Sequence, residues 1–271
     1  MKAFFVDVSI CNGCYCCQIA CKDEHVGNDW TPYAKPQPDT GQFWLKLNEH
    51  IRGTVPKVKM HYVPVLCMHC DNAPCIPACQ VEGAIYKNDD GMVIIDPVKC
   101  TGCKSCVDSC PYNAIFFNDN LNIAQKCSGC AHLLASGWKE PRCVDACPNE
   151  ALRFGEESEL KDLIAEGKVR NPEYGTKPRV YYKGIPKKFI AGTVYDPKEK
   201  EVVIGATCTL TAISGGEDIK AETDDFGDFW FEKLEDGDYV LKIEAKGFDS
   251  KTISSISTEK DVNLGDIPLA R

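Results

Sequence analysis

The sequence has no long hydrophobic run and no excess of basic residues. No apolar stretch approaches the ~20 residues that an α-helix needs to span a bilayer. Its 31 Lys and Arg are outnumbered by 40 Asp and Glu, which gives a net charge of −9. Because phosphate binding requires a basic face, this balance argues against a nucleic-acid partner. The N-terminus, MKAFFVDVSIC, has neither a signal peptide nor a twin-arginine sequence, so we expect no export signal on this chain.

Conventional catalytic motifs are also missing. There is no phosphate-binding P-loop, no GxGxxG after a strand, no HExxH and no nucleophile elbow. The carboxylates are interpreted as a solvated surface. Five scattered histidines fit no metal-site spacing, and we interpret them as structural or packing residues: His25, His50, His61, His69 and His132. The sequence therefore predicts no catalytic residue on this chain.

Cysteine, in contrast, is abundant, and only Cys208 lies beyond Cys147 among the 18 present. The segment Cys100–Pro111 has the spacing C-x2-C-x2-C-x3-C-P, which is typical of bacterial iron–sulfur ligation. In proteins with two such clusters the fourth cysteine ligates the neighbouring cluster, so one motif predicts another. Four related motifs are present: Cys11, Cys14, Cys17 and Cys21; Cys67, Cys70, Cys75 and Cys79; Cys100, Cys103, Cys106 and Cys110; and Cys127, Cys130, Cys143 and Cys147.

These sixteen cysteines match the ligand requirement of four [4Fe–4S] clusters. Zinc is the main alternative, since paired C-x2-C motifs also make tetrahedral sites, and disulfides are a weaker one. Zinc motifs seldom carry a third cysteine two residues further on and a fourth before proline. Cys16 is interpreted as a packed free thiol, with ligand substitution as the alternative, and Cys208 as a small core residue.

The motifs divide the chain into regions of different character. We expect a four-cluster domain over residues 1–155 with an insertion at 22–66, a helix and linker over 156–188, and an antiparallel β-sandwich over 189–271. Within the first domain, strands are expected at residues 3–10, 43–47 and 59–65, and strand pairs at 83–97 and 114–126. A helix is predicted over 156–167, and the basic run between Lys177 and Lys188 is interpreted as a solvated linker or subunit-contact strip.

The C-terminal region shows strict alternation of apolar and polar residues. Leu241 and Ile243, for example, alternate with Lys242 and Glu244, and glycines recur between such segments. Period-two alternation with regular turns predicts an antiparallel sandwich with a polar outer face. The expected fold class is therefore α+β.

The order of the motifs, with CMHCDNAPC at Cys67–Cys75 and GTKPRVYY at Gly175–Tyr182, resembles the four-cluster electron-transfer subunits of the dimethyl sulfoxide reductase family. The resemblance covers about residues 1–185. It implies tandem bacterial-ferredoxin-like (βαβ)2 units and a large catalytic partner subunit that holds molybdopterin with molybdenum or tungsten. The ferredoxin precedent also implies that paired motifs exchange their fourth cysteines. We name the four implied ligand sets by their first cysteine: the Cys11 set (Cys11, Cys14, Cys17, Cys147), the Cys127 set (Cys127, Cys130, Cys143, Cys21), the Cys67 set (Cys67, Cys70, Cys75, Cys110) and the Cys100 set (Cys100, Cys103, Cys106, Cys79).

The tail segments GTVYD (Gly192–Asp196) and GDYVLKIEAKGF (Gly237–Phe248) resemble Cna-B or carboxypeptidase-regulatory sandwiches. A ferredoxin subunit with this tail is most similar to those of transhydroxylase-like molybdopterin enzymes acting on polyhydroxylated aromatics. Four complete motifs suit net redox exchange, as in a hydroxylase or dehydroxylase, and the resemblance implies that the Cys11 set lies nearest the catalytic subunit.

Two alternatives remain: a subunit of another reductase of this family, acting on arsenate, sulfur compounds or sulfoxides, or a free-standing polyferredoxin. An attached sandwich favours an obligate subunit, because a mobile carrier gains little from a docking module. Free thiols and labile clusters predict a cytoplasmic location. The alternative is a periplasmic location reached by co-export with a partner that carries a twin-arginine signal.

Overall fold

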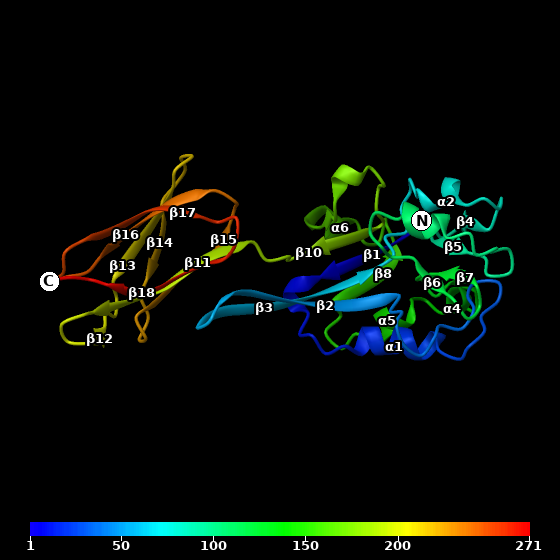
Figure 1. Ribbon diagram of the computed structural model, residues 1–271, viewed down its shortest axis with the longest axis horizontal. Helices are drawn as coiled ribbons and strands as arrows, with labels where there is room; N and C mark the ends of the chain where they lie inside the picture. Colours follow the sequence, from blue (N-terminus) through cyan, green and yellow to red (C-terminus); the bar gives the residue numbers. More distant parts are fainter. The chain divides into compact units, whose positions relative to one another are not determined.

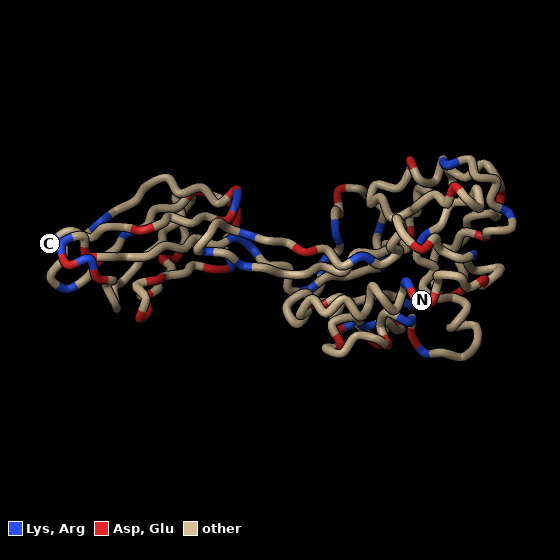
Figure 2. Tube along the Cα trace, turned by 60° about the horizontal axis from the view of Figure 1, so that its bottom comes forward, with Lys and Arg blue, Asp and Glu red and all other residues tan.

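The computed structural model describes residues 1–271 and divides them into two compact units (Figure 1). Unit 1 comprises residues 1–49 and 61–185, and unit 2 comprises residues 50–60 and 186–271. Basic and acidic residues are interspersed along both units (Figure 2). None of the helices is both long enough and apolar enough to cross a membrane.

Unit 1 contains a four-stranded sheet with the order β8 (Leu152–Glu156), β1 (Lys2–Asp7), β10 (Val180–Lys183) and β9 (Lys168–Val169). Strand β1 pairs in antiparallel fashion with β8 and in parallel with β10, which also pairs with β9. The four middle residues of β1 are all buried, as expected of a strand covered on both faces. The strand is shorter than predicted because the Asp7 side chain accepts a hydrogen bond from the Ser9 amide and begins a 3-10 turn, η1 (Val8–Ile10).

The helix expected over residues 156–167 is present but shorter, and the residues after it are not a free linker. Helix α6 covers only Lys161–Glu166, a second 3-10 turn, η2, covers Pro172–Tyr174, and β10 belongs to the sheet. Within the basic run, Arg179 is only 2% exposed whereas Lys177 and Lys187 are exposed, so the interpretation as a solvated strip fails for Arg179 and fits these two lysines. The partner that holds β10 in place is β1, almost the whole domain away in sequence, and local patterns carry no sign of such pairing.

Short helices and hairpins carry the cysteine motifs. The two expected strand pairs are confirmed as β4 (Ile85–Lys87) with β5 (Val93–Ile95), and β6 (Phe116–Asn118) with β7 (Ile123–Gln125). The helices are α1 (Cys16–His25), α2 (Cys75–Ala78), α3 (Ser105–Ser109), α4 (Ala131–Ala135) and α5 (Arg142–Asp145). Helix α1 packs against α5, and α2 packs against α3, so motifs distant in sequence come together in two pairs.

The insertion forms a hairpin longer than predicted, with strands β2 (Leu45–Thr54) and β3 (Lys57–Leu66). Its tip, residues 50–60, belongs to unit 2. There the Arg52 Nε atom lies 2.8 Å from an Asp261 carboxylate oxygen, and the Asn263 amide donates to the Thr54 carbonyl at 3.1 Å. These long-range contacts explain why a segment that resembled loop in the sequence is ordered as strands.

Unit 2 is the predicted β-sandwich, antiparallel except for one parallel strand pair. Its strands are β11 (Lys188–Asp196), β12 (Glu201–Val202), β13 (Thr207–Ala212), β14 (Ile219–Glu222), β15 (Asp228–Leu234), β16 (Asp238–Glu244), β17 (Lys251–Ser257) and β18 (Val262–Pro268). One sheet has the order β12-β11-β15 with β18 also on β11, in parallel, and the other has the order β14-β13-β16-β17. The alternation places Leu241 and Ile243 in the core, and Cys208 is fully buried among them, which confirms its assignment as a core residue.

Phe231 provides a test of this core. It is 1% exposed and packs edge-on against Phe229 at a centroid distance of 5.8 Å. We expect Phe231→Ala to lower the free energy of unfolding of unit 2 by about 3–5 kcal/mol through lost burial and a residual cavity. Calorimetric unfolding of the full chain measures this, with Phe226→Ala, at a residue that is 75% exposed, as the control. Equal small effects in both variants would contradict the assignment of the core.

Candidate functional site

The loops of the four motifs share one backbone feature. The residue directly before the second cysteine has a positive φ in every motif: Gly13, His69, Gly102 and Gly129. This turn directs amides toward the first sulfur, and the His69 and Gly129 amides donate to the Cys67 and Cys127 sulfurs at 3.5 and 3.4 Å. Glycine is required at position 13 for two reasons: its φ is positive, and any Cβ there would overlap the Tyr62 ring.

His69 takes this turn without being glycine because its ring is fixed by packing. The ring is fully buried and lies parallel to Phe4, with a centroid distance of 6.0 Å, and its Nδ1 atom accepts a hydrogen bond from the Val93 amide at 3.0 Å. Burial holds the pKa of His69 well below its usual value, so the ring is neutral. The interpretation of His69 as a packing residue is confirmed.

The first and fourth motifs meet where α1 packs against α5. Cys11, Cys14, Cys17 and Cys147 line one small cavity, with Tyr15, Leu47 and Pro64 among its other walls. Burial, followed by the charge of Cys147, raises the pKa of Cys17 to about 12. Burial, followed by the charges of Cys130, Cys21 and Cys127, raises the pKa of Cys143. The structure thus brings together the members of the Cys11 set and of the Cys127 set.

The second and third motifs meet where α2 packs against α3. Cys67, Cys70, Cys75 and Cys110 line a second cavity, closed by apolar side chains that include Val93 and Ile115. Burial, followed by the charges of Cys100, Cys103 and Cys79, raises the pKa of Cys106 to about 11. The members of the Cys67 set and of the Cys100 set are therefore also neighbours.

These groupings fit the chemistry of [4Fe–4S] clusters. Each set supplies four thiols, the ligand type that holds such clusters, and all 18 cysteines of the chain are free of disulfides. Nowhere do three or more His, Cys, Asp or Glu side chains come close enough together to share a single metal ion. Because burial raises the pKa of thiols such as Cys17 and Cys75 to about 12, loading iron onto the folded chain must displace protons.

Exposure differs between the sets. All four thiols of the Cys127 set are buried, and three of the Cys67 set are buried with the fourth partly so. The other two sets each include one exposed cysteine, Cys14 in the Cys11 set and Cys103 in the Cys100 set. Two sets therefore reach the surface and two lie inside.

His25 is a neighbour of the Cys127 set that the sequence did not reveal. It is 2% exposed, its Nε2 atom lies 3.9 Å from the Cys130 sulfur, and its ring packs on Trp44 at a centroid distance of 4.5 Å. Burial, followed by the nearby His132, lowers the pKa of His25 to about 3, so the ring is neutral. A single histidine four residues after Cys21 carries no sequence signal of this contact.

Arg179 links the second motif to the sheet. Its Nη1 atom lies 3.1 Å from the Asp71 carboxylate, directly after Cys70, and its Nη2 atom lies 2.9 Å from Glu157. Its Nε donates to the Lys2 carbonyl at 3.0 Å. This residue therefore positions the Cys67 loop against β1, which the sequence analysis missed.

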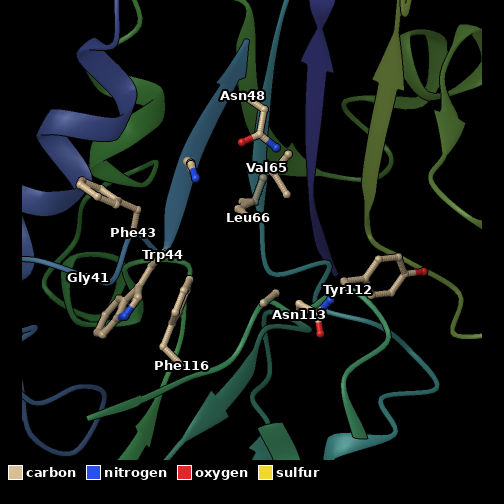
Figure 3. Close-up of a pocket in the computed structure, with 11 residues that line it drawn as sticks. Gly41, Phe43, Trp44, Asn48, Val65, Leu66, Tyr112, Asn113 and Phe116 are labelled. Carbon is tan, nitrogen blue, oxygen red and sulfur yellow. The ribbon is translucent and has the colours of Figure 1, made fainter. Parts of the chain in front are cut away.

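A larger cavity of about 320 Å³ lies beside the Cys67 set. Leu66 directly precedes Cys67, and Tyr112 follows Cys110 by two residues. Figure 3 shows the side chains around this cavity. Four of them are aromatic, namely Phe43, Trp44, Tyr112 and Phe116, and the others include Asn48, Val65, Leu66 and Asn113. The lining also includes Lys46, and it contains no carboxylate, thiol or imidazole beside the Lys46 amine and the Tyr112 hydroxyl.

Ligand and free-thiol roles can be separated by a pair of variants. We expect Cys143→Ala to remove about one to four iron atoms per chain, because a buried ligand of the Cys127 set is lost. Cys16→Ala, at a thiol outside the four sets whose sulfur lies 3.9 Å from the Cys14 carbonyl oxygen, should retain all the iron. Iron and sulfide analysis with low-temperature EPR measures both. Equal iron content in the two variants would contradict the ligand assignment.

Comparisons with known proteins agree with this geometry. Residues 58–157 match the family described as 4Fe-4S dicluster domain, and residues 190–270 match the carboxypeptidase regulatory-like domain. The protein is 38% identical to the pyrogallol hydroxytransferase small subunit of Pelobacter acidigallici over 97% of both sequences. It is 34% identical to a subunit of the tetrathionate reductase of Salmonella typhimurium, over 69% of this sequence and 74% of that one. It is also 34% identical to one polypeptide of the anaerobic dimethyl sulfoxide reductase of Escherichia coli, over 72% and 97%. The predicted α+β fold with a C-terminal sandwich is confirmed.

Proposed function

The protein belongs to the family of [4Fe–4S] electron-transfer subunits of molybdopterin oxidoreductases, and from this premise we propose that it serves a large catalytic subunit acting on polyhydroxylated aromatics. It carries electrons between that subunit and an external carrier. The observation that supports this most directly is the gathering of sixteen thiols into four sets, each with members from two motifs.

We assign one [4Fe–4S] cluster to each of the four sets. When bound, the clusters supply one-electron redox chemistry at potentials that the protein environment sets. The chain contributes the thiolates, the amides that donate to sulfur in the tight turns, and a largely apolar enclosure. The direction of electron flow follows from the potentials of these clusters relative to those of the catalytic subunit and the external carrier.

Neighbouring sets are connected through shared helices. Cys17 and Cys21 lie one turn apart on α1 and belong to the Cys11 and Cys127 sets. Cys75 begins α2 and Cys79 directly follows it, which connects the Cys67 and Cys100 sets in the same way. The charge of Cys67 acts on Cys127, where it adds to the effect of burial in raising the pKa, and so connects the two inner sets. We therefore propose the order Cys11, Cys127, Cys67, Cys100 for the sets, with the exposed Cys14 end facing the catalytic subunit.

The aromatic substrate class is supported by the extent of similarity. The pyrogallol hydroxytransferase small subunit matches 97% of this chain, whereas the tetrathionate and dimethyl sulfoxide reductase subunits match 69% and 72% of it. Four complete motifs favour net redox chemistry, such as hydroxylation or dehydroxylation, over transfer of a hydroxyl group without net electrons. We place the complex in the reducing cytoplasm, where free thiols persist.

Purification from the native source tests the partnership. We expect a large molybdenum- or tungsten-containing chain to co-elute with this one and to act on a polyhydroxylated phenol. Recovery of this chain alone, carrying all its iron, would support a free-standing polyferredoxin and contradict the proposal. A large partner active on sulfoxide or tetrathionate and inactive on phenols would leave the subunit role intact and overturn the substrate class.

The order of the sets is tested by removing a ligand at one end. In the complex, Cys14→Ala should prevent substrate-derived electrons from reaching the other three clusters, because the Cys11 set is then broken. Rapid-freeze EPR after substrate addition measures this, and Cys16→Ala is the matched control. Rapid reduction of the remaining clusters in the Cys14 variant would show that electrons enter elsewhere.

A further inference from the structure

We propose that Lys126 is a buried cation that raises the reduction potentials of the two inner clusters, those of the Cys127 and Cys67 sets. The inference rests on the ligand sets proposed above. It assigns to a residue outside the motifs the task of making the inner clusters as easy to reduce as the surface ones.

Lys126 is one of three basic residues buried in this chain, and its surroundings differ from those of the other two. It is 4% exposed, and Lys57 and Arg179 are 4% and 2% exposed. Lys57 forms an ion pair with Asp228, and Arg179 forms ion pairs with Asp71 and Glu157. Lys126 forms no ion pair with a carboxylate. Its ammonium group donates instead to the backbone carbonyls of Val93 and of Cys127, the latter at 2.9 Å.

A buried ammonium group without a counter-ion is strongly unfavourable, because carbonyl dipoles replace only part of its hydration. Folded proteins retain such a charge where a nearby negative charge compensates for it. For Lys126 the candidates are thiolates: Cys127 is the next residue, and Val93 lines the cavity of the Cys67 set. The counter-charge is therefore the pair of inner clusters themselves.

The two hydrogen bonds of Lys126 place its ammonium group next to both inner sets, since Val93 lines the cavity of the Cys67 set and Cys127 belongs to the other. Burial raises the pKa of Cys75, Cys110 and Cys127, and in each case the charge of Lys126 acts in the opposite direction. Cys75 and Cys110 belong to the Cys67 set, and Cys127 belongs to the Cys127 set.

The direction of the effect follows from charge. A cluster held by four thiolates is negative, and reduction makes it more negative by one unit. Burial removes water that would stabilise this extra charge, so it lowers the potential of an inner cluster relative to an exposed one. A fixed positive charge in a medium of low dielectric constant stabilises the reduced form and opposes that effect. The Cys11 and Cys100 sets each include one exposed cysteine, so solvent stabilises the extra negative charge of their reduced clusters.

A purely structural role is the competing explanation, since the Lys126 side chain also links β5 to the fourth motif through its two hydrogen bonds. That role predicts loss of stability without a selective change in potential. The two explanations are separated by potentials measured cluster by cluster.

Potentiometric titration of the iron-loaded protein, followed by EPR, tests the proposal. In Lys126→Met, which keeps the length of the side chain and removes its charge, the equilibrium constants for reducing two of the four clusters should each fall at least tenfold, a shift of about 59 mV for one electron. The other two should change less than twofold. The affected clusters should be those whose signals are altered by Cys143→Ala and Cys75→Ala.

Two further variants complete the design. Lys126→Arg keeps the charge and should leave the inner potentials close to those of the unaltered protein. Lys104→Met removes a charge between Cys103 and Ser105, where the side chain is 54% exposed, and solvent screening should limit its effect to less than twofold. Unchanged inner potentials in Lys126→Met, or an equal shift of all four clusters, would overturn the proposal.

If Lys126→Met fails to retain iron, the pattern of iron loss among the Lys126 variants decides between the electrostatic and the structural explanation. Loss confined to the inner sets in Lys126→Met and Lys126→Gln, with full iron in Lys126→Arg, supports the need for a positive charge. Equal loss in Lys126→Arg would assign a space-filling role and overturn the proposal. These results are distinct from failure of the proposed function, since a chain with fewer than four clusters before any substitution would contradict the ligand sets themselves.

Discussion

In the ligand sets that we propose, unit 1 depends on one constraint: sixteen thiols must converge in fours, although no motif can turn all of its own cysteines to one point. Within α1, Cys17 and Cys21 lie a full turn apart, so their sulfurs face different sets. Each set must therefore borrow a thiol from a partner motif. The packing of α1 on α5 and of α2 on α3 satisfies this requirement, and the short hairpins between motifs place the helices for it.

Burial disfavours negative charge both on the free thiols and on a reduced cluster. Apolar surroundings raise the pKa of thiols such as Cys17 and Cys130 to about 12, which opposes their ionisation until iron binds. The same surroundings disfavour the added negative charge of a reduced cluster. Backbone amides at the tight turns and Lys126 contribute partial or full positive charge where solvent is missing. In this view the polar groups inside unit 1 adjust the redox properties of the thiol sets.

Unit 2 shows a different relation between sequence and structure. Its core follows from alternation along the strands, with Leu210, Leu241 and Ile243 fully buried. The hairpin tip that joins it comes from within the iron–sulfur region of the sequence, and the ion pair of Arg52 with Asp261 connects segments 209 residues apart. Similarity to the pyrogallol hydroxytransferase small subunit extends over both regions, so the sandwich belongs to a shared architecture.

The sequence by itself determined the chemistry. The spacing of its cysteines indicated iron–sulfur ligation, and period-two alternation indicated the sandwich, because ligand spacing and strand periodicity are local properties. Only the tertiary structure decided which residues surround the thiols. Strand β10 proved to be part of the four-stranded sheet of unit 1, Arg179 proved to be buried, and His25 and Lys126 proved to lie next to the cysteine sets. Each of these depends on contacts between segments far apart in the chain, and a single histidine or lysine carries no local pattern that predicts them.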